Sequence, residues 1–340
     1  MRAIIAGAPP STDLLDPVAM PDPVRSVPSS ALPDAPVDRR GFLAAAGLAL
    51  AAACTRANGD AATADSPRVA DTVGRTGSAA GPAGGGPQPR SPVGLQLYTV
   101  RTALQRDFVG TMEQVAAIGY REVEFAGYYE RSPDEVRALL GRLNLQAPAA
   151  HVPWERTGDG WPAALAEAKA VGHQYVIVPW LPESVRGSVE SWRGVAKRLN
   201  EAGAAARDAG LSLGYHNHDF EFRPVGGQIP YDLLLAETDP ALVAFELDLY
   251  WTVRAGHDPI AYFTRHPNRF RLVHVKDSAG PPDHRMTDVG AGSIPFDRIL
   301  PAAAAAGVRH FIVEHDEPAD PMASIRASYQ AMTTLAPARS

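Results

Sequence analysis

The chain has 340 residues, of which 45% are hydrophobic and 21% charged, and its formal net charge is −6. This apolar fraction is sufficient for a hydrophobic core and excludes a wholly disordered protein. The net negative charge disfavours a nucleic-acid-binding protein, because such proteins carry a basic face. The single cysteine excludes an internal disulfide framework and a zinc site built from clustered cysteines.

The first 92 residues differ in composition from the rest of the chain. They contain no lysine, glutamate, histidine or tryptophan, so all ten histidines and all five tryptophans follow them. Residues 1–38 are rich in proline and small residues and show no helical or strand periodicity, and we predict that they are disordered. Any catalytic chemistry is therefore expected after residue 92.

Two adjacent arginines and an apolar segment predict an export signal. Arg39 and Arg40 precede residues 42–53, which as a helix would extend about 18 Å and are too few to cross a bilayer. This length is typical of the hydrophobic region of a signal peptide, and the Arg-Arg-Gly-Phe-Leu order resembles the twin-arginine signal. We therefore expect residues 1–54 to engage the twin-arginine export machinery and the protein to be periplasmic. The alternative is an ordinary N-terminal helix.

Cys54 closes the apolar segment, and its position after three alanines resembles the attachment cysteine of a lipoprotein. Leu50 lies one residue too far upstream for the usual lipoprotein pattern. Two outcomes therefore remain: acylation of Cys54, which would tether the protein to the membrane, or cleavage by an ordinary signal peptidase. Alanine, glycine and proline then make up 20 of the 38 residues in 55–92. Such a segment buries too little surface to order itself, and we predict a flexible linker.

From residue 93 onwards, short β-rich runs alternate eight times with helical patterns. The predicted strands are residues 94–100, 122–126, 145–152, 174–180, 211–218, 243–250, 270–276 and 310–315. The predicted helices are residues 108–118, 133–143, 163–171, 188–209, 231–237 and 296–306. This alternation over 93–337 predicts an α/β fold, a (β/α)8 TIM barrel. A doubly wound open sheet is the alternative, but no Gly-x-Gly-x-x-Gly turn follows the first strand.

Four consecutive predicted strands carry polar side chains near their carboxyl ends, where barrel enzymes place their chemistry. Alternate residues of a strand share a face, and the inward-facing candidates are His216, His218, Glu246, Asp248, His274, Lys276 and Glu314. Each has a structural alternative, such as a hydrogen-bonded histidine or a glutamate paired with arginine. Burying several charges together is costly, and a divalent cation would offset that cost.

The predicted metal ligands are His216, Asp248, His274 and Glu314. Their mixed nitrogen and oxygen donors suit one divalent ion, either Mn²⁺, Zn²⁺, Co²⁺, Fe²⁺ or Mg²⁺. Lys276 is one of only three lysines against 29 arginines, which indicates a need for a compact, movable ammonium at that position.

Several motifs resemble those of one known family. They are Gly94-Leu-Gln-Leu-Tyr-Thr-Val-Arg101, Tyr215-His-Asn-His-Asp-Phe-Glu-Phe222, Glu246-Leu-Asp-Leu-Tyr-Trp251, His274-Val-Lys-Asp277, Gly290-Ala-Gly-Ser-Ile294 and Glu314-His-Asp316. In these the chain resembles the xylose isomerase-like TIM-barrel superfamily, in its sugar phosphate isomerase/epimerase branch. The resemblance implies one divalent metal held by strands five to eight and a sugar-like substrate.

The same resemblance implies catalytic residues but also shows a departure. In ketose epimerases of this superfamily, glutamates on strands five and eight flank the substrate and move its proton. Glu314 matches the second glutamate, whereas His216 stands in place of the first. The candidate general bases are therefore Glu314, His151 and Glu221, with Lys276 to hold a developing oxyanion.

The predicted substrate-binding residues are His218, Glu246, Asp277, Trp251, Tyr98 and Trp154, with Trp180, Phe125 and Tyr128 as further aromatic candidates. Each aromatic residue serves equally well in packing. The leading functional hypothesis is a metal-dependent isomerase or epimerase that removes a proton next to a sugar carbonyl. The alternatives are a lyase or hydrolase that acts on 3-keto-glycosides by β-elimination and a non-catalytic sugar-binding lipoprotein. The acidic charge disfavours a nuclease related to endonuclease IV.

Overall fold

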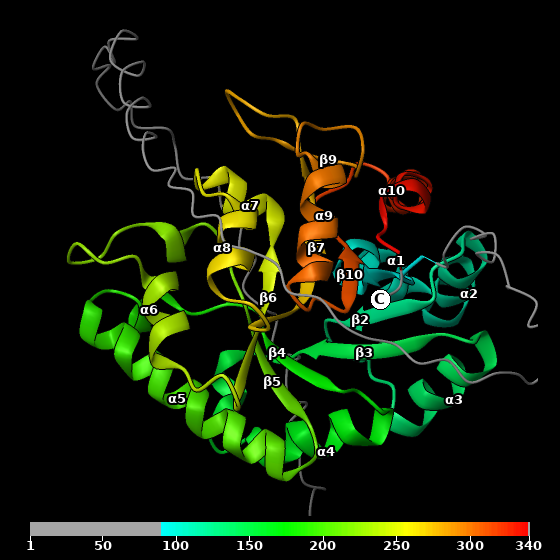
Figure 1. Cartoon of the computed structure of the whole chain (residues 1–340). Coiled ribbons are helices and arrows are strands. Elements are labelled where there is room, and N and C mark those ends of the chain that lie inside the picture. The colour runs from blue at the N-terminus through cyan, green and yellow to red at the C-terminus, as the bar shows by residue number, and fades with distance from the viewer. Residues whose placement is uncertain (1–89, 339–340) are drawn as a thin grey trace, which may run out of the picture. The chain divides into compact units, whose positions relative to one another are not determined.

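Eight parallel strands close into a barrel in the computed structural model, which describes residues 90–338 (Figure 1). Neighbouring strands follow the order β1-β10-β7-β6-β5-β4-β3-β2. This closure confirms the predicted TIM barrel and excludes the doubly wound open sheet. The predicted export signal, with Arg39, Arg40 and Cys54, lies outside the described residues, as does the linker up to residue 89.

All eight predicted strands are present, and each is shorter than predicted. The barrel strands are β1 Val93–Gln96, β2 Glu122–Phe125, β3 Gln146–His151, β4 Tyr175–Val178, β5 Ser212–His216, β6 Val243–Asp248, β7 Phe270–Val275 and β10 His310–Val313. A separate antiparallel pair, β8 Asp277–Ser278 and β9 Met286–Thr287, lies in the loop after β7.

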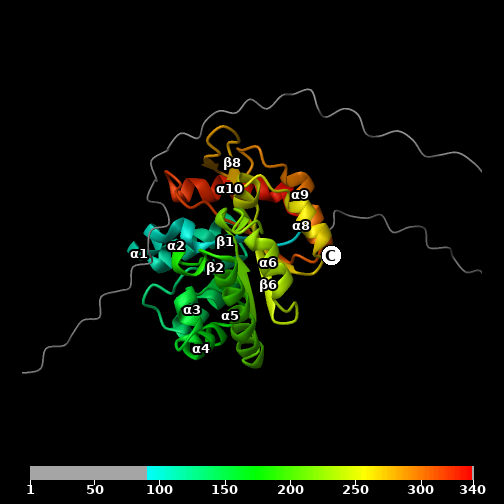
Figure 2. The same cartoon turned by 90° about the vertical axis from the view of Figure 1, so that its left-hand side faces the viewer.

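Helices cover the outside of the barrel. They are α1 Arg101–Arg106, α2 Phe108–Ile118, α3 Pro133–Leu143, α4 Trp161–Val171, α5 Val189–Asp208, α6 Pro230–Glu237, α7 Leu249–Arg254, α8 Pro259–Arg265, α9 Phe296–Ala305 and α10 Pro321–Leu335. Helices α3, α4 and α5 pack side by side along the outer face of the strands (Figure 2). Between residues 90 and 338, no helix combines the length and hydropathy needed to cross a membrane.

Two predicted strands end early because a polar side chain caps the following turn. The strand predicted over 94–100 ends at Gln96, whose Oε1 accepts a hydrogen bond from the Tyr98 backbone N–H at 3.0 Å. The strand predicted over 243–250 ends at Asp248, which caps α7 by accepting from the Trp251 N–H at 2.9 Å. Both capping residues thereby lie at the carboxyl end of the barrel.

An apolar layer fills the barrel below its carboxyl end. Ala149, Ile177, Leu272 and Ile312 are buried and contact one another. Gly214 leaves room for the tip of the Ile177 side chain, which a Cβ atom at that position would displace. Three of the four strands then carry a polar residue two positions later: His151, His274 and Glu314. The apolar layer therefore lies directly below these polar side chains inside the barrel.

Candidate metal centre

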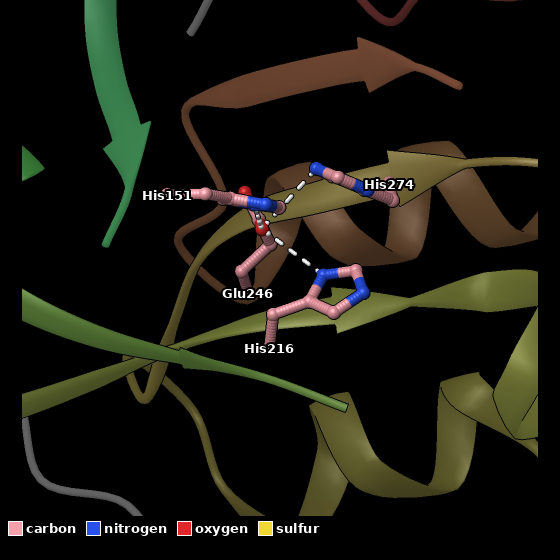
Figure 3. Close-up of side chains that lie close together, drawn as sticks. All are labelled: His151, His216, Glu246 and His274. Carbon is pink, nitrogen blue, oxygen red and sulfur yellow. Dashed lines mark hydrogen bonds and ion pairs between the residues drawn. The ribbon is translucent and has the colours of Figure 1, made fainter. Parts of the chain in front are cut away.

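Three histidines converge on one oxygen of Glu246 inside the barrel. Glu246 Oε2 lies 3.1 Å from His151 Nε2, 3.1 Å from His216 Nδ1 and 3.2 Å from His274 Nε2 (Figure 3). The four residues come from β3, β5, β6 and β7, and Glu246 is fully buried. We call these four residues the inner cluster.

A second group lies closer to the mouth and shares His274 with the inner cluster. Asp248, His274 and Glu314 offer ligand atoms that all lie within 4.8 Å of one another. His216 lies beside this group, since its Nε2 is 3.8 Å from Asp248 Oδ2. The structure thus brings together the four predicted ligands, and we call them the outer cluster.

Lys276 places a buried ammonium beside the outer cluster. Its Nζ lies 3.0 Å from Asp248 Oδ2, 2.9 Å from Glu314 Oε2 and 2.8 Å from Asp316 Oδ1. Burial lowers the pKa of Lys276, but the three carboxylates outweigh burial and raise it well above its usual value. Lys276 therefore stays charged and offers hydrogen-bond donors at the barrel mouth.

The same electrostatic competition sets the protonation of the other residues. Burial lowers the pKa of His151, but Glu124 and Glu246 outweigh burial and raise it to about 9. Burial raises the pKa of Glu314, but the charges of Lys276 and His274 hold it well below its usual range. Burial and the charge of His274 lower the pKa of His216. At neutral pH His151 is protonated and Glu314 is a carboxylate.

Glu124 of β2 is a member of the site that sequence analysis missed. Its Oε2 lies 2.6 Å from His274 Nε2 and 3.3 Å from His151 Nε2, and it accepts a hydrogen bond from Gln96 Nε2 at 2.7 Å. Glu122 and Glu124 alternate along β2 as Glu246 and Asp248 do along β6. That alternation was the signal that could have identified Glu124 as a site residue. Asp316, two residues after Glu314, was also not predicted as a site residue.

Two residues predicted to act in catalysis or substrate binding, Glu221 and Asp277, hydrogen-bond to neighbouring segments of the chain. Glu221 accepts from the Tyr215 hydroxyl at 2.6 Å and from the His218 backbone N–H at 2.9 Å, and burial raises the pKa of Glu221 to about 8. Asp277 accepts hydrogen bonds from four backbone N–H groups, those of Ser278, Gly290, Gly292 and Ile294. Both carboxylates therefore organise loops beside the barrel mouth.

Arginines cover one face of four of the six aromatic residues that the sequence offered as sugar contacts. The guanidinium carbon lies 3.9 Å from the ring centroid for Arg101 over Tyr98, 4.3 Å for Arg198 over Trp154, 5.4 Å for Arg186 over Trp180 and 5.3 Å for Arg254 over Trp251.

Trp251 is also a neighbour of the outer cluster. Its ring centroid lies 5.3 Å from that of His218 and 5.7 Å from Lys276 Nζ. Trp154 is only 5% exposed and belongs to the core, while Phe125 and Tyr128 pack around His173. Of these aromatic residues, Trp251 has the contacts that suit a substrate neighbour.

The donor set and three buried carboxylate oxygens without a hydrogen bond fit a divalent cation. Glu124 Oε1 and Glu246 Oε1 are buried and have no hydrogen-bond partner within the described residues. Asp248 Oδ2 lies near the Lys276 ammonium but accepts no hydrogen bond from it. Unpartnered buried carboxylate oxygens are costly. A cation held by imidazole nitrogens and carboxylate oxygens would offset that cost.

Residues 112–335 match the model of the family described as Xylose isomerase-like TIM barrel. The chain belongs to this family. An inosose dehydratase of Clostridium beijerinckii is 25% identical over 193 residues, which are 51% of this chain and 64% of that relative. The chain thus matches less than two thirds of that relative's length.

Solved structures agree with this family and its fold. A sugar phosphate isomerase/epimerase of Parabacteroides distasonis aligns with a TM-score of 0.64 and 25% identity, over 74% of this chain and 98% of that one. The IOLI protein, solved with a bound zinc atom, aligns with a TM-score of 0.59 and 15% identity, over 72% and 97%. That likeness shows the fold alone. Members of the family named here include isomerase/epimerases and dehydratases.

Proposed function

We propose that the chain is a divalent-metal-dependent enzyme that removes a proton next to the carbonyl of a sugar or sugar derivative. The observation that carries this proposal is the outer cluster, in which Asp248, His274 and Glu314 come together and His216 lies beside Asp248, on β5, β6, β7 and the segment just after β10. An ion bound there supplies Lewis-acid stabilisation of the negative charge that develops as the proton leaves. Mn²⁺, Zn²⁺, Co²⁺, Fe²⁺ and Mg²⁺ all accept such a donor set.

The surrounding residues suggest how the proton is handled. Glu314 is our candidate general base, because its carboxylate is ionised and lies at the barrel mouth just after β10. His151 carries a proton at neutral pH and suits a general acid. Glu221 already accepts two hydrogen bonds, one from the Tyr215 hydroxyl of β5 and one from the His218 backbone N–H. Lys276 is placed to donate a hydrogen bond to a substrate oxygen, and Trp251 to contact the substrate ring.

The leading reaction is isomerisation or epimerisation, in which the proton returns to a carbon of the substrate. A dehydratase-type β-elimination starts with the same proton removal and then expels the substituent two carbons away. The named inosose dehydratase among the relatives favours this second candidate, which includes lyases and hydrolases of 3-keto-glycosides. A sugar-binding protein without catalysis would not need a buried ligand set of this charge.

The predicted export signal extends this proposal to the location of the protein. Arg39, Arg40 and the candidate lipidation site Cys54 would place the barrel in the periplasm, free or tethered to the membrane. A free sugar or glycoside is then the proposed substrate, because phosphorylated sugars are mainly cytoplasmic.

Metal analysis and deuterium exchange test the proposal together. Protein purified without added metal is expected to hold about one divalent ion per chain, and His216→Ala is expected to lose it. His310→Ala is the matched control, because His310 lies at the opposite end of the barrel and pairs with Glu122 at 3.0 Å. Protein without a stoichiometric ion would contradict the proposal.

Incubation with candidate keto-sugars in D2O then separates the two reactions. Deuterium in a recovered or epimerised sugar indicates an isomerase or epimerase. Release of water or of an aglycone indicates elimination. Neither exchange nor release with any keto-sugar, in metal-loaded protein, would contradict proton abstraction itself.

A further inference from the structure

His216 and His274 both lie between the outer cluster and a deeper carboxylate. His274 Nδ1 lies 2.7 Å from Glu314 Oε2, and its Nε2 lies 2.6 Å from Glu124 Oε2. His216 Nε2 lies 3.8 Å from Asp248 Oδ2, and its Nδ1 lies 3.1 Å from Glu246 Oε2. Each imidazole therefore presents one nitrogen to the candidate ion site and the other to a buried glutamate.

A neutral imidazole has one N–H group and one lone pair, and a metal ion binds only the lone pair. A carboxylate that accepts the N–H decides which nitrogen keeps the lone pair and fixes the ring orientation. We propose that Glu124 and Glu246 are positioning residues that make His274 ligate through Nδ1 and His216 through Nε2. This inference rests on the proposed metal site.

Glu124 is itself fixed by a chain of directional hydrogen bonds. Gln96 Nε2 donates to Glu124 Oε2 at 2.7 Å, and Gln96 Oε1 accepts the Tyr98 backbone N–H at 3.0 Å. The second bond sets which end of the Gln96 amide faces Glu124. Glu124 is fully buried, so water does not compete as an acceptor for His274. The short turn after β1 thus helps to orient a ligand on β7.

Glu246 orients His216 in a corresponding way, through the His216 Nδ1 atom on the side away from Asp248. It is fully buried between His151, His216 and His274, and its strand also carries Asp248 two residues later. One strand therefore supplies a carboxylate for the ion and a carboxylate for the histidine that binds it. This placement favours a positioning role for Glu246, where the sequence predicted a substrate contact.

Metal titration of matched variants tests the inference. Glu124→Leu and Glu246→Leu are each expected to weaken Co²⁺ binding by about 10- to 100-fold. Glu124→Gln keeps a carbonyl acceptor and is expected to lose less. Glu122→Leu is the control, because Glu122 is also buried on β2 but pairs with His310, away from the ion site. Its Co²⁺ affinity should equal that of the wild type.

Proton NMR of the Co²⁺ protein reports directly on the ring N–H groups of the ligating histidines, which a loss of stability alone would not change. Two exchangeable, paramagnetically shifted ring N–H signals are expected in the wild type, one from each ligating histidine. Loss of one signal in Glu124→Leu, with the other retained, supports the assignment. Circular dichroism checks that each variant is folded.

The outcomes separate this inference from the proposed function. If the wild type binds no ion, the proposed function fails and the inference with it. If the wild type binds one ion and both leucine variants bind it equally well, the inference alone fails. Two ions per wild-type chain, one of them lost in Glu246→Leu, would make the inner cluster a ligand set and also overturn it. If the leucine variants do not fold, absence of ring N–H signals in the wild type overturns it.

Discussion

His151 carries a raised pKa because its ring faces two buried carboxylates, Glu124 and Glu246, at 3.3 and 3.1 Å. Burial opposes this effect and is outweighed, so the pKa of His151 rises from the usual 6.5 to about 9. Protonation of this histidine therefore stabilises the folded state. The stabilisation is complete below about pH 6.5 and is lost as the pH rises to about 9, by about 3 kcal/mol in total.

Unfolding of His151→Gln measures this contribution. In EDTA, the difference in free energy of unfolding between the wild type and His151→Gln should shrink as the pH rises from 6.5 to 9. Urea titrations at both pH values provide the measurement, because the variant carries every other titrating group. A difference that stays constant or grows with pH would show that the carboxylates do not hold a proton on His151.

The alternation of polar and apolar residues along the strands predicted the outer cluster but not Glu124, which contacts the outer-cluster residue His274. His216, Asp248, His274 and Glu314 were found because each lies near the end of a β-rich run. Glu124 lies on an equally alternating strand, yet its partner His274 is 150 residues away. Only the closure of the barrel brings β2 and β7, which β1 and β10 separate, to one interior, and a single sequence does not encode that proximity in any local pattern.

At the scale of elements, Asp277 holds the loop that follows β7. Its carboxylate accepts four backbone N–H groups, and Gly292 packs so closely that a Cβ atom would overlap Asp277 and the Ser278 carbonyl. Asp277→Asn replaces one acceptor oxygen by an N–H₂ group that faces donors. Since a buried unsatisfied donor costs about 1–3 kcal/mol, stability should fall by that amount.

Hydrogen exchange locates the effect of Asp277→Asn. Amides of residues 288–294 should exchange faster than in the wild type, while the metal content should not change. Asp283→Asn is the matched control, because Asp283 is an exposed residue of the same loop whose carboxylate accepts from the Arg285 N–H at 3.3 Å. Unchanged exchange in 288–294 would mean that Asp277 does not order this loop.

The helix boundaries show which elements a single sequence predicts. Helices α2 and α3 have the predicted bounds, with Asp107 and Ser132 as N-caps. The first two residues of helix α7 were predicted as the end of a strand, because a short buried apolar run fits either structure. The deciding contact is the Asp248 cap, which forms only once β6 ends at the barrel mouth.

At the scale of the whole barrel, an ion in the outer cluster would link β5, β6 and β7 with the segment just after β10. These four segments are distant in sequence but adjacent around the barrel, so the complete ligand set exists only in the folded state. Binding to the folded state alone adds RT ln(1 + [L]/Kd), about 2.7 kcal/mol when the ion is at 100 times its Kd. For a domain of about 150–250 residues, 1 kcal/mol shifts Tm by about 2–4 °C.

We therefore expect Tm to rise by about 5–10 °C when protein in EDTA is transferred to Mn²⁺ or Zn²⁺ at 100 times the measured Kd. Asp248→Asn should lose this increment, because a neutral amide is a poor ligand, while its carbonyl still caps α7. Glu201→Gln is the control, since Glu201 pairs with Lys197 on the exposed face of α5. Equal Tm values with and without the ion, or a full increase in the Tm of Asp248→Asn, would contradict binding of the ion at the outer cluster.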